Sequence, residues 1–192
     1  MTIARPTSLV CTAIFISSLI AVFAAPAYAG DSICEAEMTR AADAYDVPLG
    51  VLYAVGMTET GQRGKLHPYA LNIAGRSYFA TGVRDAVETF EKERKRGIRL
   101  IDLGCMQINH HYHGKEFTSV EDMLDPVQNV EYAAKFLKHL RQREGSWTLA
   151  VARYHAGPNN NPAQKRYVCA VIRNMVASGF GQWTANARTF CA

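Results

Sequence analysis

The stretch DPVQNVEYAAKFLKHLRQREG, residues 125–145, carries the clearest helical pattern in the chain. Asp125-Pro126 at its start and Gly145 at its end are typical helix start and stop signals. Apolar residues recur between them at helical spacing, among them Val130 and Leu137. The stretch therefore predicts a long helix with one face turned toward a core, and a chain that is mainly α-helical.

Helical signals continue on both sides of this stretch. A Ser-x-x-Glu capping pattern starts a helix over residues 32–45, and an apolar helix over 48–60 is closed by Gly61. Further helices are expected over residues 84–96, 146–154 and 161–178. Residues 71–79 predict a short β-hairpin around Ala74-Gly75. Residues 98–109 are expected to be extended or looped, and residues 179–192 irregular. The expected class is mainly α (α+β), with five to seven helices and one small hairpin.

The first 29 residues have the order of a secretory signal. Arg5 precedes an apolar run over residues 9–25, and the small residues Ala27 and Ala29 follow. An uncleaved membrane anchor is the alternative, although the run is shorter than the roughly 20 apolar residues that span a bilayer. We expect cleavage before Gly30 and a single domain over residues 30–192. That domain would lie in the periplasm, or be secreted, without membrane attachment.

Four cysteines remain after the expected cleavage, because Cys11 lies in the signal. An even number in an exported domain favours two disulfides, for which three pairings exist. We favour Cys34–Cys105 and Cys169–Cys191, since the last two lie in one C-terminal segment. A metal site is the alternative, but no Cys-x-x-Cys spacing supports it. The pI near 8.8 suits an anionic polymer such as a cell wall only weakly, because the basic residues are scattered, and we expect no nucleic-acid partner.

Glu59 is the first candidate for chemistry, because it ends a helix that is otherwise apolar. The partial negative charge of a helix C-terminus and apolar neighbours both favour a protonated carboxyl group. A carboxylic acid that stays protonated near neutral pH can donate a proton to the leaving oxygen of a glycosidic bond. An exposed glutamate at a helix end is the alternative interpretation.

Two further segments carry polar side chains in apolar surroundings. Residues 104–109 place Met106, Gln107 and Asn109 close together, and amides can both donate to and accept from sugar hydroxyl groups. Residues 153–158 place Tyr154 near a helix end, before a Gly-Pro turn, where it could line a cleft. Taken alone, the first segment could be an ordinary loop and Tyr154 an ordinary packing residue.

In this order, the three segments resemble the lytic transglycosylase domain, the family of soluble lytic transglycosylases related to goose-type lysozyme. The matching motifs are Glu59-Thr60, residues 104–107 and residues 153–155, together with the long helix from residue 125 to 137. The resemblance covers roughly residues 36–176. Thr60, Cys105 and His155 stand where the family usually has Ser, Leu and Asn, which puts the polar contacts at His155 in doubt. Residues 68–76 and 108–114 resemble members associated with conjugation and type IV secretion or with cell-wall remodelling.

The resemblance implies a lysozyme-like fold that cleaves the β-1,4 bond between N-acetylmuramic acid and N-acetylglucosamine in peptidoglycan. Glu59 would act first as acid and then as base, and the product would end in 1,6-anhydromuramic acid. The implied substrate-binding residues are Asn72, Thr60, Met106, Gln107, Asn109 and Tyr154. No metal or cofactor is implied. The expected partners are glycan strands and components of an envelope secretion or conjugation apparatus, and we expect a monomer.

Three alternatives remain open at this point. Water could replace the sugar hydroxyl as nucleophile, which would make the protein a lysozyme, and a second carboxylate near Glu59 would favour this. Asp85, Asp102 and Glu116 are the candidates for it. The chain could also be a non-catalytic peptidoglycan-binding or assembly protein. A metalloenzyme is the third alternative, but the histidines at 110, 111 and 113 lack the spacing of zinc proteases.

Overall fold

The computed structural model describes Met1, residues 33–157 and residues 161–192, so the expected signal segment lies outside the described residues except for Met1. The chain divides into the units Met1–Gly30 and Asp31–Ala192, and the fold below is that of the second. Its helices are α1 (Ile33–Tyr45), α2 (Leu49–Glu59), α3 (Val83–Lys95), α4 (His110–His113), η1 (Gly114–Glu116), α5 (Val120–Leu124), α6 (Pro126–Glu144), α7 (Trp147–Ala156), α8 (Asn161–Ala177) and α9 (Ala185–Cys191). The mainly α class is confirmed. The expectation of an irregular C-terminal segment was wrong, because Thr184 caps α9 by accepting from the backbone N–H of Ala187.

A small antiparallel sheet completes the fold. Its strands are β1 (Ala70–Ile73), β2 (Arg76–Phe79), β3 (Ile101–Leu103) and β4 (Ile108–Asn109), in the order β2-β1-β3-β4. The predicted hairpin is confirmed: Ala74 and Gly75 both have positive φ, 49° and 92°, as a two-residue hairpin turn requires. The segment expected to be extended or looped adds β3 and β4, so the sheet is larger than one hairpin.

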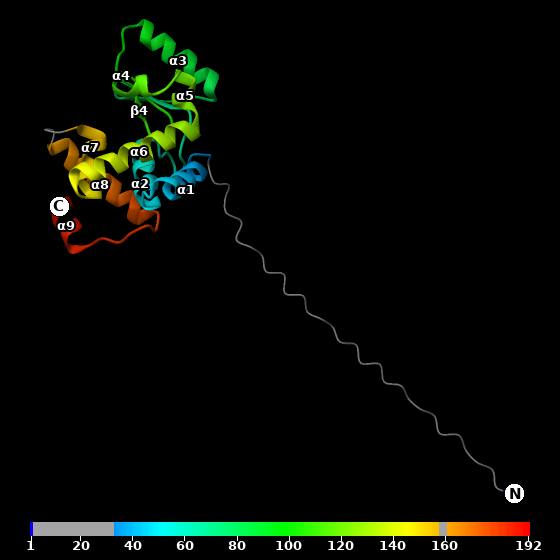
Figure 1. The fold of residues 1–192 in the computed structure, drawn as a ribbon, viewed down its shortest axis with the longest axis vertical. Helices are drawn as coiled ribbons and strands as arrows, with labels where there is room; N and C mark the ends of the chain where they lie inside the picture. The colour runs from blue at the N-terminus through cyan, green and yellow to red at the C-terminus, as the bar shows by residue number, and fades with distance from the viewer. Residues whose placement is uncertain (2–32, 158–160) are drawn as a thin grey trace. The chain divides into compact units, whose positions relative to one another are not determined.

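Helix α6 is the longest helix among the described residues and follows the predicted pattern closely. Asp125 caps it by accepting from the backbone N–H of Gln128 at 3.0 Å, and Gly145 ends it with φ +80°. It packs against α1 and α7, while α2 packs against α8. In Figure 1, α6 runs between the strands with α3 and the group formed by α1, α2, α7 and α8.

Helix α2 lies deep in this helical group. Leu52, Ala54 and Val55 are fully buried. Gly56 has no room for a side chain, because a Cβ atom there would lie 2.3 Å from Cε of Met38. The close approach of α1 and α2 at Gly56 fixes the position of the C-terminal turn of α2, which ends at Glu59.

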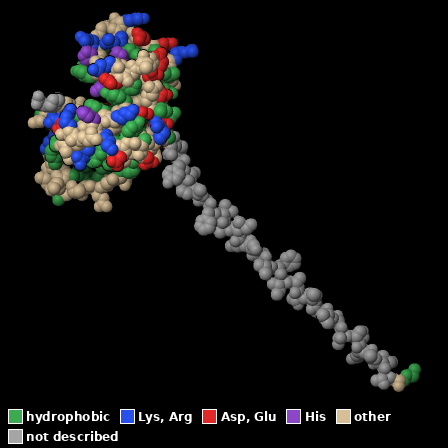
Figure 2. Space-filling view, viewed as in Figure 1, with side chains coloured by type: hydrophobic (Ala, Val, Ile, Leu, Met, Phe, Trp, Pro, Cys, Tyr) green, Lys and Arg blue, Asp and Glu red, His purple; other side chains and the backbone are tan. Residues whose placement is uncertain are grey.

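Two disulfides join distant parts of the chain, with the pairing that the sequence favoured. Cys34 at the start of α1 is bonded to Cys105, and Cys169 in α8 is bonded to Cys191 in α9. Over the ranges that the structure describes, we find no helix both long and apolar enough to cross a membrane. Lys and Arg side chains are interspersed with acidic and neutral ones on the face shown in Figure 2.

Candidate active site

The end of α2 opens into a cleft of about 700 Å³. Its walls come from the β1–β2 turn, strands β3 and β4, helix α4, the middle of α6 and the C-terminal end of α7. The residues that line it are Glu59, Asn72, Ala74, Gly75, Leu100, Asp102, Gln107, Ile108, Asn109, Tyr112, His113, Phe136, Arg153, Tyr154, His155, Ala156 and Gly157. The cleft therefore gathers residues from every segment that the sequence analysis singled out.

Glu59 is a partly buried acid at one side of this cleft. Burial raises the pKa of Glu59 to about 8, and the negative charge of Asp102 acts in the same direction. The phenol of Tyr167 opposes them, since its Oη donates a hydrogen bond of 2.5 Å to Oε1 of Glu59 and thereby lowers this pKa. Glu59 is consequently protonated at neutral pH, the state that a proton donor requires.

Tyr167 is the residue of the site that the sequence analysis missed. It lies on α8, is almost completely buried, and packs its ring flat against His155 with centroids 4.2 Å apart. Its neighbours Val168 and Val171 are buried too, so Tyr167 belongs to the core face of α8. A buried phenol needs a hydrogen-bond partner, so a tyrosine on a core face could have been expected to bond a buried polar group such as Glu59.

A tight loop carries Gln107 into the cleft that Glu59 also lines. Gly104 and Gln107 adopt positive φ of 81° and 48°. The side chain of Asn129 bonds the loop, donating to the carbonyl of Leu103 and accepting from the N–H of Met106. A Cβ atom at Gly104 would lie 2.4 Å from Nδ2 of Asn129, so the loop depends on glycine at this position.

The cleft does not contain all the predicted substrate-binding residues. Glu59, Asn72, Gln107, Asn109 and Tyr154 line it. Thr60 and Met106 do not line it. Thr60 is 3% exposed and Met106 0% exposed.

These two residues support the loop instead. Thr60 Oγ1 donates to the carbonyl of Cys105 at 3.2 Å. The Met106 carbonyl accepts from Oη of Tyr154 at 2.7 Å. The first bond ties the end of α2 to the loop that carries Gln107, and the second ties the end of α7 to the same loop.

Asp102 is a second carboxylate in the same cleft. Burial raises its pKa, and a hydrogen bond from Nδ2 of Asn109 to its Oδ1 lowers it. In the sheet, Asp102 is paired with Asn72 on the neighbouring strand. The other two candidates, Asp85 and Glu116, do not line the cleft.

Aromatic side chains form the far wall of the cleft. His113 bonds Oη of Tyr132 at 2.8 Å through Nδ1, and its ring lies 5.1 Å from that of Phe136. Phe136 in turn contacts Tyr154. His110 packs on Phe90. Within residues 33–157 and 161–192, no group of three or more His, Cys, Asp or Glu is placed to hold a metal ion.

Comparison with known families agrees with this geometry. The family model of the Transglycosylase SLT domain matches residues 37–174, well over half of the chain. Searches of curated proteins and of solved structures gave no significant match. The chain belongs to the Transglycosylase SLT domain family, whose substrate is peptidoglycan. The predicted resemblance to lytic transglycosylases is thereby confirmed.

Proposed function

We propose that this protein cleaves the β-1,4 bond between N-acetylmuramic acid and N-acetylglucosamine in peptidoglycan, with Glu59 as the group that transfers the proton. The observation that carries the proposal is the position of Glu59. It is a carboxylic acid with a pKa of about 8 that lines a cleft of about 700 Å³. General acid catalysis requires such a protonated donor near the working pH.

In the first step the Glu59 proton moves to the glycosidic oxygen, and the bond from that oxygen to the anomeric carbon breaks. N-acetylglucosamine leaves with a free hydroxyl group. The carbonyl oxygen of the substrate's own N-acetyl group stabilises the positive charge on the muramic acid ring. Tyr167 stabilises the new Glu59 carboxylate through its 2.5 Å hydrogen bond.

In the second step the Glu59 carboxylate takes the proton of the muramic acid C6 hydroxyl, whose oxygen attacks the anomeric carbon. This forms the 1,6-anhydro ring and returns Glu59 to its protonated state. The polar residues of the cleft position the sugar. Nε2 of Gln107 donates to the carbonyls of Ala70 and Gly104, so Oε1 of Gln107 is left to accept a hydrogen bond from the sugar. Asn72 accepts from the N–H of Gly75 through Oδ1, which leaves its Nδ2 as a donor.

Hydrolysis is the second candidate, and Asp102 is the observation that favours it. Two carboxyl groups on one cleft are the usual arrangement of glycoside hydrolases. Asp102 would take the proton of a water molecule, and the product would have an ordinary reducing end. This mechanism predicts that Asp102→Asn abolishes cleavage, whereas the transglycosylase mechanism predicts that cleavage persists.

Mass spectrometry of fragments released from purified peptidoglycan separates the two. The transglycosylase mechanism predicts fragments that end in 1,6-anhydro-N-acetylmuramic acid, released by the unaltered chain and absent with Glu59→Gln. Reducing ends would establish the lysozyme alternative. No release by either protein would indicate a binding or assembly role.

The place of action follows from the proposed substrate. We propose export through the signal at residues 1–29 and action in the periplasm, where glycan strands are accessible. We further propose that cleavage of the glycan serves the assembly of a secretion or conjugation apparatus. This proposal rests on the resemblance of residues 68–76 and 108–114 alone. Loss of assembly of such an apparatus in a Glu59→Gln strain, with normal cell growth, would support it.

A further inference from the structure

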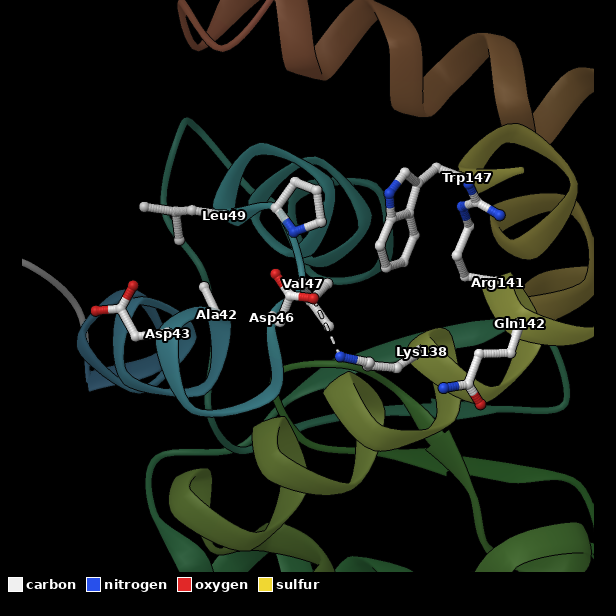
Figure 3. Close-up of a pocket in the computed structure, with 10 residues that line it drawn as sticks. Ala42, Asp43, Asp46, Val47, Leu49, Lys138, Arg141, Gln142 and Trp147 are labelled. Carbon is white, nitrogen blue, oxygen red and sulfur yellow. Dashed lines mark hydrogen bonds and ion pairs between the residues drawn. The ribbon is translucent and has the colours of Figure 1, made fainter. Parts of the chain in front are cut away.

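A second pocket, of about 710 Å³, lies where the α1–α2 turn faces the C-terminal half of α6 and the start of α7 (Figure 3). It is lined by Ala42, Asp43, Asp46, Val47, Pro48, Leu49, Lys138, Arg141, Gln142 and Trp147. None of these residues lines the cleft of Glu59. The pocket adjoins the first residue of α2 and Glu59 is the last, so about 16 Å of helix separates the two sites.

Charges of opposite sign line this pocket. Asp43 and Asp46 belong to the end of α1 and the turn after it, and Lys138 and Arg141 belong to α6. Asp46 and Lys138 form an ion pair at 3.2 Å, with 96% of the Asp46 side chain exposed. An exposed pair of this kind contributes at most about 1 kcal/mol, so a ligand can replace either partner at little cost.

Arg141 is the basic residue that the fold leaves without an acidic partner here. Its neighbours Lys138 and Arg143 both have carboxylates in ion-pair contact, in Asp46 and Glu144. Within residues 33–157 and 161–192, no carboxylate lies in ion-pair contact with Arg141. Its guanidinium group instead lies 6.0 Å over the ring of Trp147. The donors of Arg141 are therefore available for a carboxylate.

Trp147 and the turn before α2 supply an apolar surface between these charges. Trp147 is half-buried and packs against the core, while Val47, Pro48 and Leu49 form the opposite side. Figure 3 shows Trp147 and Arg141 together on one side of the pocket and Asp43 at the other. A ligand that fits must have a free carboxylate, a free ammonium group and a short carbon chain between them.

We propose that this pocket binds the peptide that is attached to the glycan, through a side-chain ammonium group and the C-terminal carboxylate of that peptide. The proposal rests on the proposed action on peptidoglycan, in which every muramic acid carries such a peptide. Arg141 takes the C-terminal carboxylate, Asp43 and Asp46 take the ammonium group of the diaminopimelate side chain, and Trp147 covers the carbon chain between the two. The pocket then holds a peptide of the wall while the cleft holds a glycan strand.

The test uses intrinsic fluorescence. The chain has two tryptophans, so Trp183→Phe leaves Trp147 as the reporter. The probe is the tetrapeptide L-Ala-γ-D-Glu-meso-diaminopimelate-D-Ala, with the purified chain. We expect a saturable change in emission that Arg141→Ala weakens at least about tenfold, because a charge-assisted bond of 1.5 kcal/mol or more is lost.

Two matched variants make the result specific. Arg143→Ala removes a neighbouring arginine outside the pocket and should bind the peptide normally. Glu59→Gln should also bind it normally while releasing no glycan fragments, which separates this proposal from the proposed function. The proposal is overturned if no saturable change occurs, if Arg141→Ala and Arg143→Ala bind alike, or if a peptide-free chitin oligosaccharide produces the same change.

Discussion

Replacing Tyr167 by Phe removes the hydrogen bond to Glu59 while keeping the ring that packs on His155. This bond lowers the pKa of Glu59, so its loss lets that pKa rise above about 8. A hydrogen bond to a charged group contributes about 1.5–3 kcal/mol, and 1.36 kcal/mol corresponds to one pKa unit. Since Glu59 is partly open to the cleft, we take the lower end and expect a rise of roughly one pH unit.

The sign of the effect on activity follows from the protonation state. Glu59 must be protonated to act as acid, so activity is lost as the pH rises through its pKa. Tyr167→Phe therefore moves the alkaline limb of the kcat/KM profile to higher pH by roughly one unit. The variant is also slower at its optimum, because the carboxylate formed in the first step loses its donor.

The assay is the initial rate of fragment release from purified glycan strands between pH 5 and pH 10, with Tyr154→Phe as the matched control. Tyr154 lies in the same cleft but donates to the Met106 carbonyl, so its loss should lower the rate without moving the alkaline limb. An alkaline limb that stays in place in Tyr167→Phe, or moves to lower pH, would refute the assignment of Glu59 and Tyr167.

Three further predictions concern stability. Glu59→Gln should raise the free energy of unfolding relative to the unaltered chain by about 3 kcal/mol more at pH 7 than at pH 4, because the raised pKa of Glu59 disfavours folding only above its ordinary value. Equal differences in urea titrations at both pH values would contradict this. Replacing Cys34 and Cys105 by Ser removes a disulfide between residues 71 positions apart, and should lower the free energy of unfolding by about 4 kcal/mol and abolish most of the activity. Loss of the Cys169–Cys191 disulfide should leave the activity at the pH optimum unchanged. Asn129→Ala leaves the N–H of Met106 unpaired and should cost about 3 kcal/mol in thermal unfolding, and a loss below 1 kcal/mol would show that the loop needs no such support.

The parts predictable from sequence were those with a local signal. Helix α6 has its cap, its apolar face and its terminal glycine within 21 residues, and all three are where the pattern placed them. Glu59 could be singled out because a carboxylate at the C-terminal end of an apolar helix is unfavourable for the stability of the fold. The hairpin was identifiable from Gly75, because glycine adopts the positive φ of a turn without steric cost.

The parts that could not be predicted depend on contacts between distant residues. Tyr167 reaches Glu59 across 108 positions, and its own neighbourhood in sequence resembles any core helix. Met106 was expected to contact substrate because its neighbours Gln107 and Asn109 are polar, but the loop turns its side chain into the core. Strand β3 has three residues and is defined by its pairing with β1 rather than by its own alternation.

The central claim is that Glu59 cleaves glycan strands without using water. Its most direct test is digestion of purified peptidoglycan in water enriched in the heavy oxygen isotope, with the released ends analysed by mass spectrometry. The account predicts 1,6-anhydro ends that contain no heavy oxygen, formed by the unaltered chain and not by Glu59→Gln. Reducing ends that carry the heavy isotope would contradict it and make the protein a lysozyme.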